Sequence, residues 1–471
     1  MALPQSDGKD SHRQKLDTEY RRKIDEVKRL SESGEYQEAM EAANEVLADN
    51  FDDPLAIFFL AYCLMKTERY GLAYNLFRRC SELSPSKCEP WNNAGMCHQE
   101  TWNLEEAERC FRKSLKLEPD NAAAMQNLAL IYVNKCLPDE ALKWIGRAEK
   151  TNQPTWQALD NKALALLMKG EWKEGWACYR ATAGRDKVRQ LTVYKNPEEP
   201  MWSGERGRVV IYGTQGLGDE LSFASCIPDA MQKAEVIIDC DHRLEGLFKR
   251  SFPEAKVYGT RFKDVTWKEE IDYSIPSDCL PSIFRNSTEE FPGTQYLRAD
   301  PERRIQWRAL FDTLKRPTIG IAWTGGRKNT GRKKRSLTLD DLEPILKSVD
   351  ATWVSLEYKD RSEEIDAFRK KTGIQIHDWK RATQTQDYDD TAALVAELDC
   401  VVSVTTAVIH LSGALGKDCY CLVPNLPRWF YKVEGGTMPW YKSVKLYRQS
   451  KGGTWPIQDI ANLLKLKYGH R

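Results

Sequence analysis

Three groups of residues in the second half of the chain have the types and spacing that proton transfer and phosphate binding require. In the first group, Asp219 follows a glycine-rich loop that contains Gly216 and Gly218. A carboxylate at this place can accept a proton from an attacking hydroxyl group. It can also cap the start of a helix, where Asp is favoured. Both interpretations stay open, and Glu220 is the weaker alternative for the base.

The second group is a basic loop that follows Trp323. Its cationic residues are Arg327, Lys328, Arg332, Lys333, Lys334 and Arg335. Arginine and lysine hold phosphate oxygens through charge-assisted hydrogen bonds, whereas a dense run of charge is also typical of a solvated loop. We predict that the residues binding phosphate here are Thr324, Lys328, Arg335 and Ser336.

The third group lies in "SVTTAVIHLSGALG", residues 403–416, where a strand ends at Val404 and a helix begins at Thr405 or Thr406. The first N–H groups of a helix, together with the threonine hydroxyls, form a binding site for phosphate. His410 lies about one helical turn after Thr406, on the same face. It is either a contact to the same ligand or a packed core histidine.

Short apolar and β-branched runs, which alternate with helical stretches, must position these groups. The first series of predicted strands covers 209–212, 234–241, 255–259 and 271–276, and the second covers 318–323, 352–357, 373–378, 399–404 and 419–423. Two series of strand–helix units predict two Rossmann-like lobes, at 208–310 and 316–471. Ligands of such lobes bind in the cleft at the carboxyl ends of the strands.

The first half of the chain repeats with a period of 34 residues. Small residues recur at Ala39, Ala73, Ala107, Ala141 and Gly175. Three positions before each of them stand Tyr36, Tyr70, Leu104, Pro138 and Trp172. The small residue lets two antiparallel helices approach closely, and the larger one fills the gap between repeats. Pro85 and Pro119, also 34 apart, end the second helix of a pair because proline lacks the N–H that would continue it.

This pattern resembles the tetratricopeptide repeat (TPR) family, most clearly in "EPWNNAGMCHQETWNLEEAERCFRKSLKLEPDN" at 89–121. The resemblance covers residues 20–183, about five repeats, although Pro138 stands at a turn and Phe51 replaces one proline. A solenoid of this kind has a concave surface for a peptide or protein partner. It can equally serve only to stiffen the molecule or to form a dimer.

Residues 184–207 lose the helical period and contain several prolines and glycines, so we predict a linker there. Within it, "PMWSGE" is the part expected to pack, because Trp202 is a large apolar residue to leave exposed.

The segments "QGLGDELSFASCIP" and "DYDDTAALVAELDCVVSVTTAVIHLSGALGKDCYCLVP" resemble the family 9 glycosyltransferases, which include the heptosyltransferases of bacterial lipopolysaccharide synthesis. "MPWYKSVKLYRQSKGGTWP" resembles the TPR-linked branch of that family. The resemblance implies a GT-B fold, with the acceptor on lobe 208–310 and a nucleotide sugar on lobe 316–471. It implies that Asp219 is the catalytic carboxylate and that Arg335 and Ser336 match the family's phosphate-contacting Arg-Ser step. Thr405 departs from the family, which has Asp there.

The expected fold class is therefore an N-terminal TPR α-solenoid followed by a GT-B fold of two Rossmann-like lobes. By architecture alone, the chain is also similar to protein O-linked N-acetylglucosamine transferases. We predict an inverting, metal-independent glycosyltransferase without a cofactor, which transfers a sugar from a nucleotide-diphosphate donor to a glycan or protein acceptor. The alternative, favoured by Thr405, is a TPR scaffold with a degenerate enzyme domain. A dehydrogenase fits two such lobes but lacks the dinucleotide fingerprint.

Composition limits the other classes of function. The net charge is +1, from 70 Lys+Arg and 69 Asp+Glu, so no overall attraction to nucleic acid is expected. There is no run of about 18 apolar residues and no apolar signal-peptide core in residues 1–22. The 13 cysteines fit reduced thiols, with Cys419 and Cys421 expected in a buried strand. We therefore predict a cytoplasmic protein.

Overall fold

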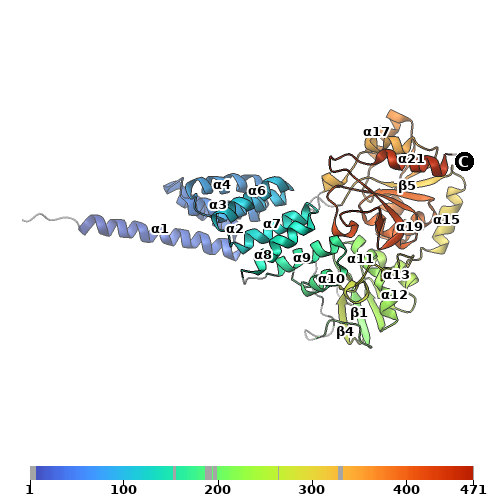
Figure 1. The fold of residues 1–471 in the computed structure, drawn as a ribbon, viewed down its shortest axis with the longest axis horizontal. Helices are drawn as coiled ribbons and strands as arrows, with labels where there is room; N and C mark the ends of the chain where they lie inside the picture. Colours follow the sequence, from blue (N-terminus) through green and yellow to red (C-terminus); the bar gives the residue numbers. More distant parts are fainter. Residues whose placement is uncertain are drawn as a thin grey trace, which may run out of the picture. The chain divides into compact units, whose positions relative to one another are not determined.

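The computed structural model describes residues 7–151, 155–185, 192, 194, 199–261, 263, 265–326 and 332–469. The side chains of residues 7–17, 332 and 333 are outside this description. The chain divides into two compact units, Met1–Asn161 and Lys162–Arg471. In Figure 1 the first unit is coloured from blue to teal and the second from green to red.

Helical repeats occupy the N-terminal part of the chain, as predicted. Five consecutive helix pairs are described: α1 (Asp7–Ser33) and α2 (Tyr36–Asp49), α3 (Pro54–Lys66) and α4 (Tyr70–Leu83), α5 (Glu89–Glu100) and α6 (Leu104–Leu117), α7 (Ala122–Asn134) and α8 (Pro138–Glu149), α9 (Trp156–Lys169) and α10 (Trp172–Ala181). The second helix of each pair begins 34 residues after the previous one. The larger residue of each predicted repeat is therefore the first residue of a helix, a position at which Pro138 is well tolerated.

A left-handed residue ends the first helix of every pair. Backbone φ is positive at Gly34, Glu68, Trp102, Cys136 and Gly170, again at intervals of 34. The next residue donates its N–H five residues back, as from Arg69 to the Leu64 carbonyl at 2.8 Å. This is the Schellman arrangement, which satisfies carbonyls at a helix end.

Small residues permit the close helix packing that the period predicts. Ala39, Ala73, Ala107 and Ala141 are fully buried. A Cβ on Gly175 would lie 2.9 Å from a side-chain carbon of Leu167. The small positions are therefore set by the distance between helices.

The first sheet has four parallel strands in the order β3-β2-β1-β4. They are β1 (Arg208–Tyr212), β2 (Glu235–Asp239), β3 (Lys256–Tyr258) and β4 (Tyr273–Pro276), with helices α11 (Leu217–Phe223), α12 (Ile227–Met231), α13 (Glu245–Ser251) and α14 (Pro281–Phe284). The strand order reverses direction between β1 and β4, and ligands of such sheets bind at the carboxyl ends of the strands at this point. The loop after β1 leads into α11, the helix that carries Asp219.

The second sheet has seven strands in the order β10-β11-β9-β8-β5-β6-β7, parallel except for β10. Its strands are β5 (Thr318–Ala322), β6 (Thr352–Ser355), β7 (Ile376–His377), β8 (Cys400–Val404), β9 (Cys419–Val423), β10 (Thr437–Met438) and β11 (Tyr441–Arg448). The accompanying helices are α15 (Pro301–Phe311), α16 (Leu339–Leu346), α17 (Ser362–Thr372), α18 (Lys380–Thr383), α19 (Tyr388–Glu397), α20 (Ala407–Ala414) and α21 (Ile457–Tyr468). The order reverses between β5 and β8, where the loop after Trp323 and the start of α20 lie.

Each strand from β1 to β9 overlaps a predicted strand, whereas β10 and β11 were not predicted. Cys419 and Cys421 are fully buried in β9, as expected. The polar pattern of β11 hid this strand, because it is buried only at alternate and irregular positions. It extends the sheet by pairing in parallel with β9, and β10 pairs with its other edge.

The last helix of the repeats belongs to the second unit. The division falls inside α9, at residues 161 and 162, rather than at the predicted end of the solenoid at 183. Part of the predicted linker is also packed. Trp202 is fully buried, and its backbone N–H donates to the Ser274 carbonyl at 3.0 Å. This segment therefore extends the edge of the first sheet at β4.

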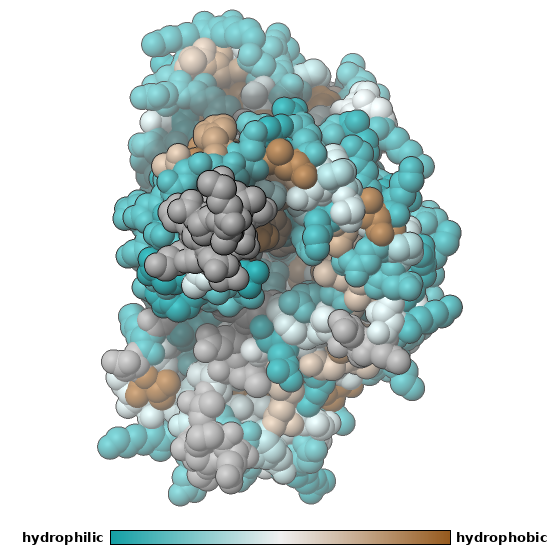
Figure 2. All heavy atoms as spheres, turned by 90° about the vertical axis from the view of Figure 1, so that its left-hand side faces the viewer, coloured by the Kyte–Doolittle hydropathy of each residue, from teal (hydrophilic) through white to brown (hydrophobic). Residues whose placement is uncertain are grey.

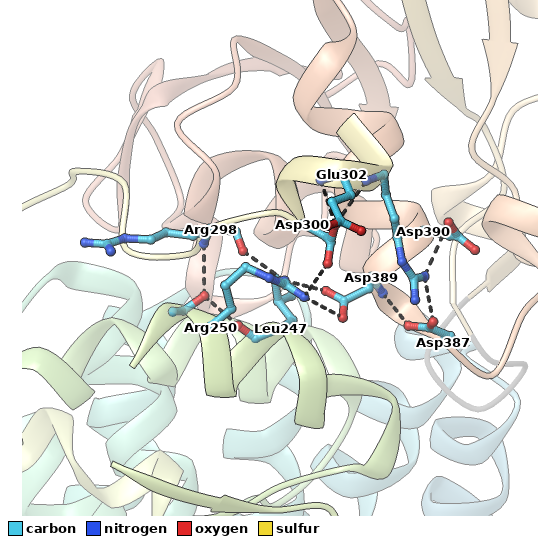
Figure 3. A network of polar contacts seen from close by, with 10 residues as sticks. Leu247, Arg250, Arg298, Asp300, Glu302, Asp387, Asp389 and Asp390 are labelled. Atoms are coloured by element: carbon cyan, nitrogen blue, oxygen red, sulfur yellow. Dashed lines mark hydrogen bonds and ion pairs between the residues drawn. The ribbon is translucent and has the colours of Figure 1, made fainter. Parts of the chain in front are cut away.

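An ion-pair network joins the two lobes away from the glycine loop (Figure 3). Arg250 on α13 donates to both carboxylate oxygens of Asp389 on α19, at 2.8 and 3.0 Å, and also to Asp300 at 3.2 Å. Asp300 caps α15, the helix between the two sheets. A Cβ on Gly246 would lie 2.4 Å from Asp389, which shows how closely α13 and α19 approach.

The molecular face drawn in Figure 2 is mainly hydrophilic, with hydrophobic residues in small separate groups. No helix in the described part of the chain combines the length and apolar character needed to cross a membrane.

Candidate functional site

Asp219 lies in the first turn of α11, directly after the glycine loop. Its carboxylate accepts a hydrogen bond from the Gly216 N–H at 3.0 Å, and Gly216 is the N-cap of the helix. Asp219 therefore supports the helix start from the third helical position instead of capping it. Only the Oδ2 atom of the carboxylate makes this contact. The role of Asp219 as a base stays a prediction.

The environment of Asp219 favours its protonated form. Burial is the main cause that raises its pKa, and Asp278 adds to the rise, while Arg428, the Gly216 N–H and Arg261 oppose it. A carboxylate with a raised pKa is a better proton acceptor once ionised. Arg428 is an exposed residue in the loop after β9, and its charge acts on Asp219 from the second lobe.

Glu220, the weaker alternative for the base, is engaged elsewhere. It is buried, forms an ion pair with Arg261, and accepts the Asp241 N–H at 3.0 Å. A Cβ on Gly213 would lie 2.3 Å from its carboxyl carbon. Glu220 therefore supports the glycine loop through its contacts with Gly213, Asp241 and Arg261. Asp219 is the carboxylate that is more available to accept a proton.

The two lobes meet at the glycine loop. A Cβ on Gly218 would lie 3.2 Å from the Ala407 Cα and 3.2 Å from the His410 ring. Both of these residues belong to α20 of the second lobe. Gly218 thus permits close contact between the helix that carries Asp219 and the helix predicted to bind phosphate.

The start of α20 is built from the two predicted threonines. Thr406 is the N-cap, and its hydroxyl accepts the Val408 N–H at 3.3 Å. The Thr405 carbonyl accepts a hydrogen bond from Arg335 at 3.3 Å. The Thr405 hydroxyl is buried and has no hydrogen-bond partner among the described residues. Arg335 therefore lies beside the N-terminus of α20.

The charge of a second cation, Arg428, acts on Arg335. Burial lowers the pKa of Arg335, and the nearby charge of Arg428 lowers it further. Two arginines whose charges repel each other, one of them beside a helix N-terminus, are an arrangement that an anion would stabilise.

The remaining loop residues hold the backbone. The Ser336 hydroxyl accepts the Gly325 N–H at 2.9 Å. The Thr324 N–H donates to the buried carboxylate of Glu357 at 2.8 Å, and the Thr324 hydroxyl bonds to the same carboxylate. Thr324 and Ser336 thus shape the loop after β5. Lys328 lies outside the described residues.

His410 is packed in the interface between the lobes. Its side chain is 7% exposed, and its Nδ1 lies 2.6 Å from the Ser222 hydroxyl on α11. Burial lowers its pKa to about 3, so the ring is neutral at physiological pH. The residue joins α20 to α11, which accounts for its burial without a ligand.

The site therefore brings together Asp219, Gly216, Gly218, Arg335, Thr405, Thr406 and His410 around the meeting point of α11 and α20. Arg428, which precedes three aromatic residues in "PRWFY" at 427–431, was not among the predicted site residues. Those aromatics are buried, as are Trp440 and Tyr441. The signal for Arg428 was its place after a predicted strand of the second lobe. No group of three metal-ligating side chains is found in the described part of the chain.

Comparisons with known proteins bear mainly on the repeats. The family described as "Anaphase-promoting complex, cyclosome, subunit 3" matches residues 32–114. "Tetratricopeptide repeat-containing protein trd-1" of Caenorhabditis elegans is 27% identical over 128 residues, which cover 27% of this chain and 17% of that protein. The chain contains tetratricopeptide-type repeats.

A longer similarity reaches into the α/β region. "Protein FlbA" of Caulobacter vibrioides is 28% identical over 420 residues, covering 84% of this chain and 70% of that protein. Because neither unit alone makes up that share of the chain, the similarity extends over both.

Solved structures resemble the repeats at low overall scores. A thermophilic TPR protein of Thermus thermophilus is 18% identical, with a TM-score of 0.31 over 35% of this chain and 89% of its own. PilF of Pseudomonas aeruginosa is 17% identical, with a TM-score of 0.33 over 36% of this chain and 79% of its own. None of these descriptions names a glycosyltransferase, so that assignment stays a prediction.

Proposed function

We propose that the chain is an inverting, metal-independent glycosyltransferase of the GT-B type, which uses a nucleotide-diphosphate sugar. The acceptor is a glycan or a protein, and the repeats recruit it or a protein partner. The observation that carries the proposal is the contact of Gly218 with α20. This contact supports a single site that combines the carboxylate of Asp219 with the cationic end of α20, at the strand ends where both sheets reverse order.

The reaction assigns a role to each part of this site. The acceptor hydroxyl oxygen attacks C1 of the sugar from the side opposite to the diphosphate, and a new C1–O bond forms. The bond from C1 to the diphosphate oxygen breaks, and the leaving group takes its electron pair. Asp219 accepts the hydroxyl proton. Arg335, Arg428 and the N–H groups at the start of α20 stabilise the diphosphate.

The alternative function is a TPR scaffold whose enzyme domain is degenerate. Thr405 favours it, because its buried hydroxyl stands where the resembling family has a carboxylate. The family match to the repeats is also compatible with a protein-binding role. The two functions differ in turnover, because a scaffold does not release nucleotide from any donor.

Nucleotide release from UDP-, GDP-, ADP- and CMP-linked sugars, with donor binding followed by thermal shift, tests the proposal. We expect one donor to stabilise the protein and to be slowly hydrolysed. Asp219→Asn should lower turnover by about 10²–10⁴ and leave donor binding unchanged. Asp366→Asn, an exposed position on α17, is the matched control. Hydrolysis that persists in Asp219→Asn contradicts the assignment of the base.

Arg335→Ala tests the phosphate site separately. It should weaken binding of the matching nucleoside diphosphate by about tenfold or more, because a charge-assisted hydrogen bond is lost. Binding of the nucleoside alone should not change. Equal loss for both ligands would indicate general damage to the lobe.

A further inference from the structure

Helix α10 carries a polar group at a position that is apolar in the preceding repeats. Tyr179 occupies the place of Phe77, Phe111 and Ile145 in the 34-residue period. Those three side chains are fully or almost fully buried. Tyr179 is also buried, at 3% exposure, so its ring keeps the apolar role and its hydroxyl is an addition.

This hydroxyl reaches the glycine loop of the first lobe. The Gln215 side-chain amide donates to the Tyr179 hydroxyl at 2.5 Å and to the Asp278 carboxylate at 2.9 Å. The Tyr179 hydroxyl itself lies 3.4 Å from the same carboxylate oxygen. Asp278 is fully buried, and it follows β4 at the carboxyl end of the sheet. The three side chains therefore form one polar cluster inside the protein.

Gln215 is a strained residue in a functional loop. Its φ is +58°, a left-handed conformation that non-glycine residues adopt at a cost. The cluster holds its side chain, and Arg261 donates to its carbonyl oxygen at 2.7 Å. The next residue is Gly216, whose N–H binds the Asp219 carboxylate. Contacts at Gln215 thus set the direction from which the chain enters the turn with Asp219.

We propose that Tyr179 and Gln215 are positioning residues, through which the last repeat helix holds the glycine loop so that Asp219 meets the acceptor hydroxyl. The role of Asp219 in this inference rests on the proposed function. The claim that α10 holds the glycine loop does not depend on that function. The aromatic ring of Tyr179 has a separate packing role, since its centroid lies 5.7 Å from the ring centroid of Trp176 and 6.4 Å from that of Trp429. Tyr179→Phe removes the hydroxyl and keeps that packing.

The first experiment does not require activity. Amide hydrogen exchange, followed by mass spectrometry in the full chain, compares the wild type with Tyr179→Phe and Gln215→Ala. We expect faster exchange in residues 213–219 for both variants and no change in β5 to β9. Tyr420→Phe is the control, because it is a buried tyrosine whose hydroxyl bonds to Lys467 instead. Unchanged exchange in residues 213–219 overturns the inference.

The second experiment uses turnover of the donor found in the hydrolysis screen. Both variants should lower kcat by about tenfold while the KM for the donor stays within about twofold, because misplacement of a reacting group acts on the chemical step. The double variant should lose little more than either single one, since both break the same cluster. A loss in KM alone, or full additivity, contradicts a positioning role.

The pH profile separates positioning from general destabilisation. A looser loop lets water reach Asp219, so the pKa that burial raises should fall toward the ordinary value. The base must be ionised, so activity is lost as pH falls through this pKa, and the acid limb should move to lower pH in Tyr179→Phe. If no donor is hydrolysed by the wild type, the proposed function fails, whereas the exchange result still decides whether α10 holds the loop.

Discussion

Helices α8 and α10 occupy the same place in the repeat but have different surroundings. Both begin at the same point of the 34-residue period, and both follow a left-handed turn residue. On α8 the side chain of Leu142 is half-buried, whereas Trp176, 34 residues later on α10, is 1% exposed. Trp176 packs edge-to-face on Trp429, and Trp172 contacts Phe291. The repeat pattern therefore specifies the helix but not what covers its outer face.

This difference shows how one repeat unit serves two purposes. In the first unit, the residues that correspond to Trp176 are Met40, Tyr74, Glu108 and Leu142, and the last three of them are only partly buried. In α10 the same face is aromatic, and it is buried against the second and first lobes. The last repeat helix is thus part of the α/β core, and it brings Tyr179 to the glycine loop.

Truncation should have the largest effect on this comparison. A chain that begins at residue 184 lacks α10 and exposes the aromatic cluster around Trp429 and Trp440. Large aromatic side chains bury about 150–250 Å² each. The burial free energy lost with Trp172, Trp176 and Tyr179 of α10 is therefore comparable to the net stability of a whole domain, about 5–15 kcal/mol. We expect this chain to aggregate or to unfold without cooperativity. A chain that begins at 152 retains α9 and α10 and should show one cooperative transition by calorimetry.

Equal behaviour of the two truncated chains would break the comparison. If the chain from 184 unfolds as cooperatively as the chain from 152, then α10 is not part of the core of the second unit.

Trp176→Ala should lower the free energy of unfolding by about 3–5 kcal/mol, because it leaves a large cavity among buried rings. Leu142→Ala, at the equivalent position of α8, should cost less than about 1.5 kcal/mol, because the side chain is half-exposed and alanine favours the helix. Urea denaturation of the full chain measures both. Similar costs would show that the outer face of α10 is not more tightly packed than that of α8.

Loss of an ion pair should also lower the stability more in the second unit than in the first. Arg250→Ala leaves Asp389, whose side chain is 8% exposed, without its bidentate partner. Because Arg250 is itself 24% exposed, we expect a cost of about 1–3 kcal/mol, below the value for a fully buried pair. Arg79→Ala breaks the exposed pair with Asp52 in the repeats and should cost at most about 1 kcal/mol. Thermal unfolding that orders these variants the other way contradicts the inter-lobe role of Arg250.

The turn residues should show the smallest effects and no difference between the regions. Gly34→Ala and Gly170→Ala each place a side chain at a positive φ, at a cost of about 1 kcal/mol. Glu68→Gly relieves the same strain in a turn of the first unit, and should stabilise by at most about 1 kcal/mol after the entropy of glycine is included. Chemical denaturation measures whether the free energy of unfolding falls in the two Gly→Ala variants and rises in Glu68→Gly. A much larger cost at Gly170 would indicate that this turn depends on the nearby Lys432 side chain.

Much of the fold follows from local patterns in the sequence. The 34-residue period predicted the helix pairs because every repeat obeys the same distances between helices. Strands β1 to β9 were found because buried parallel strands are short apolar runs. Strand β11 was missed, since it alternates irregularly between exposed and buried positions. The packing of Trp202 was foreseen from its size alone.

The candidate site was only partly predictable. Asp219, Arg335, Thr405 and Thr406 follow strands whose ends converge, so their proximity could be inferred. The burial of His410 against Ser222 and the attachment of Thr324 to Glu357 depend on side chains far away in sequence. Arg428 stands before a run of aromatic residues, and its place after the predicted strand β9 is the one local signal that could have identified it.

The sequence by itself determined the repeat period, the two series of strands and the residues that end each strand, because these depend on contacts within about one helix pair or one strand–helix unit. Only the tertiary structure decided that α10 belongs to the α/β core, that Glu220 is held by Arg261, and that Tyr179 meets Gln215. These contacts join residues far apart in the chain, such as Tyr179 and Asp278, and their formation depends on how whole elements pack rather than on the preferences of any one segment.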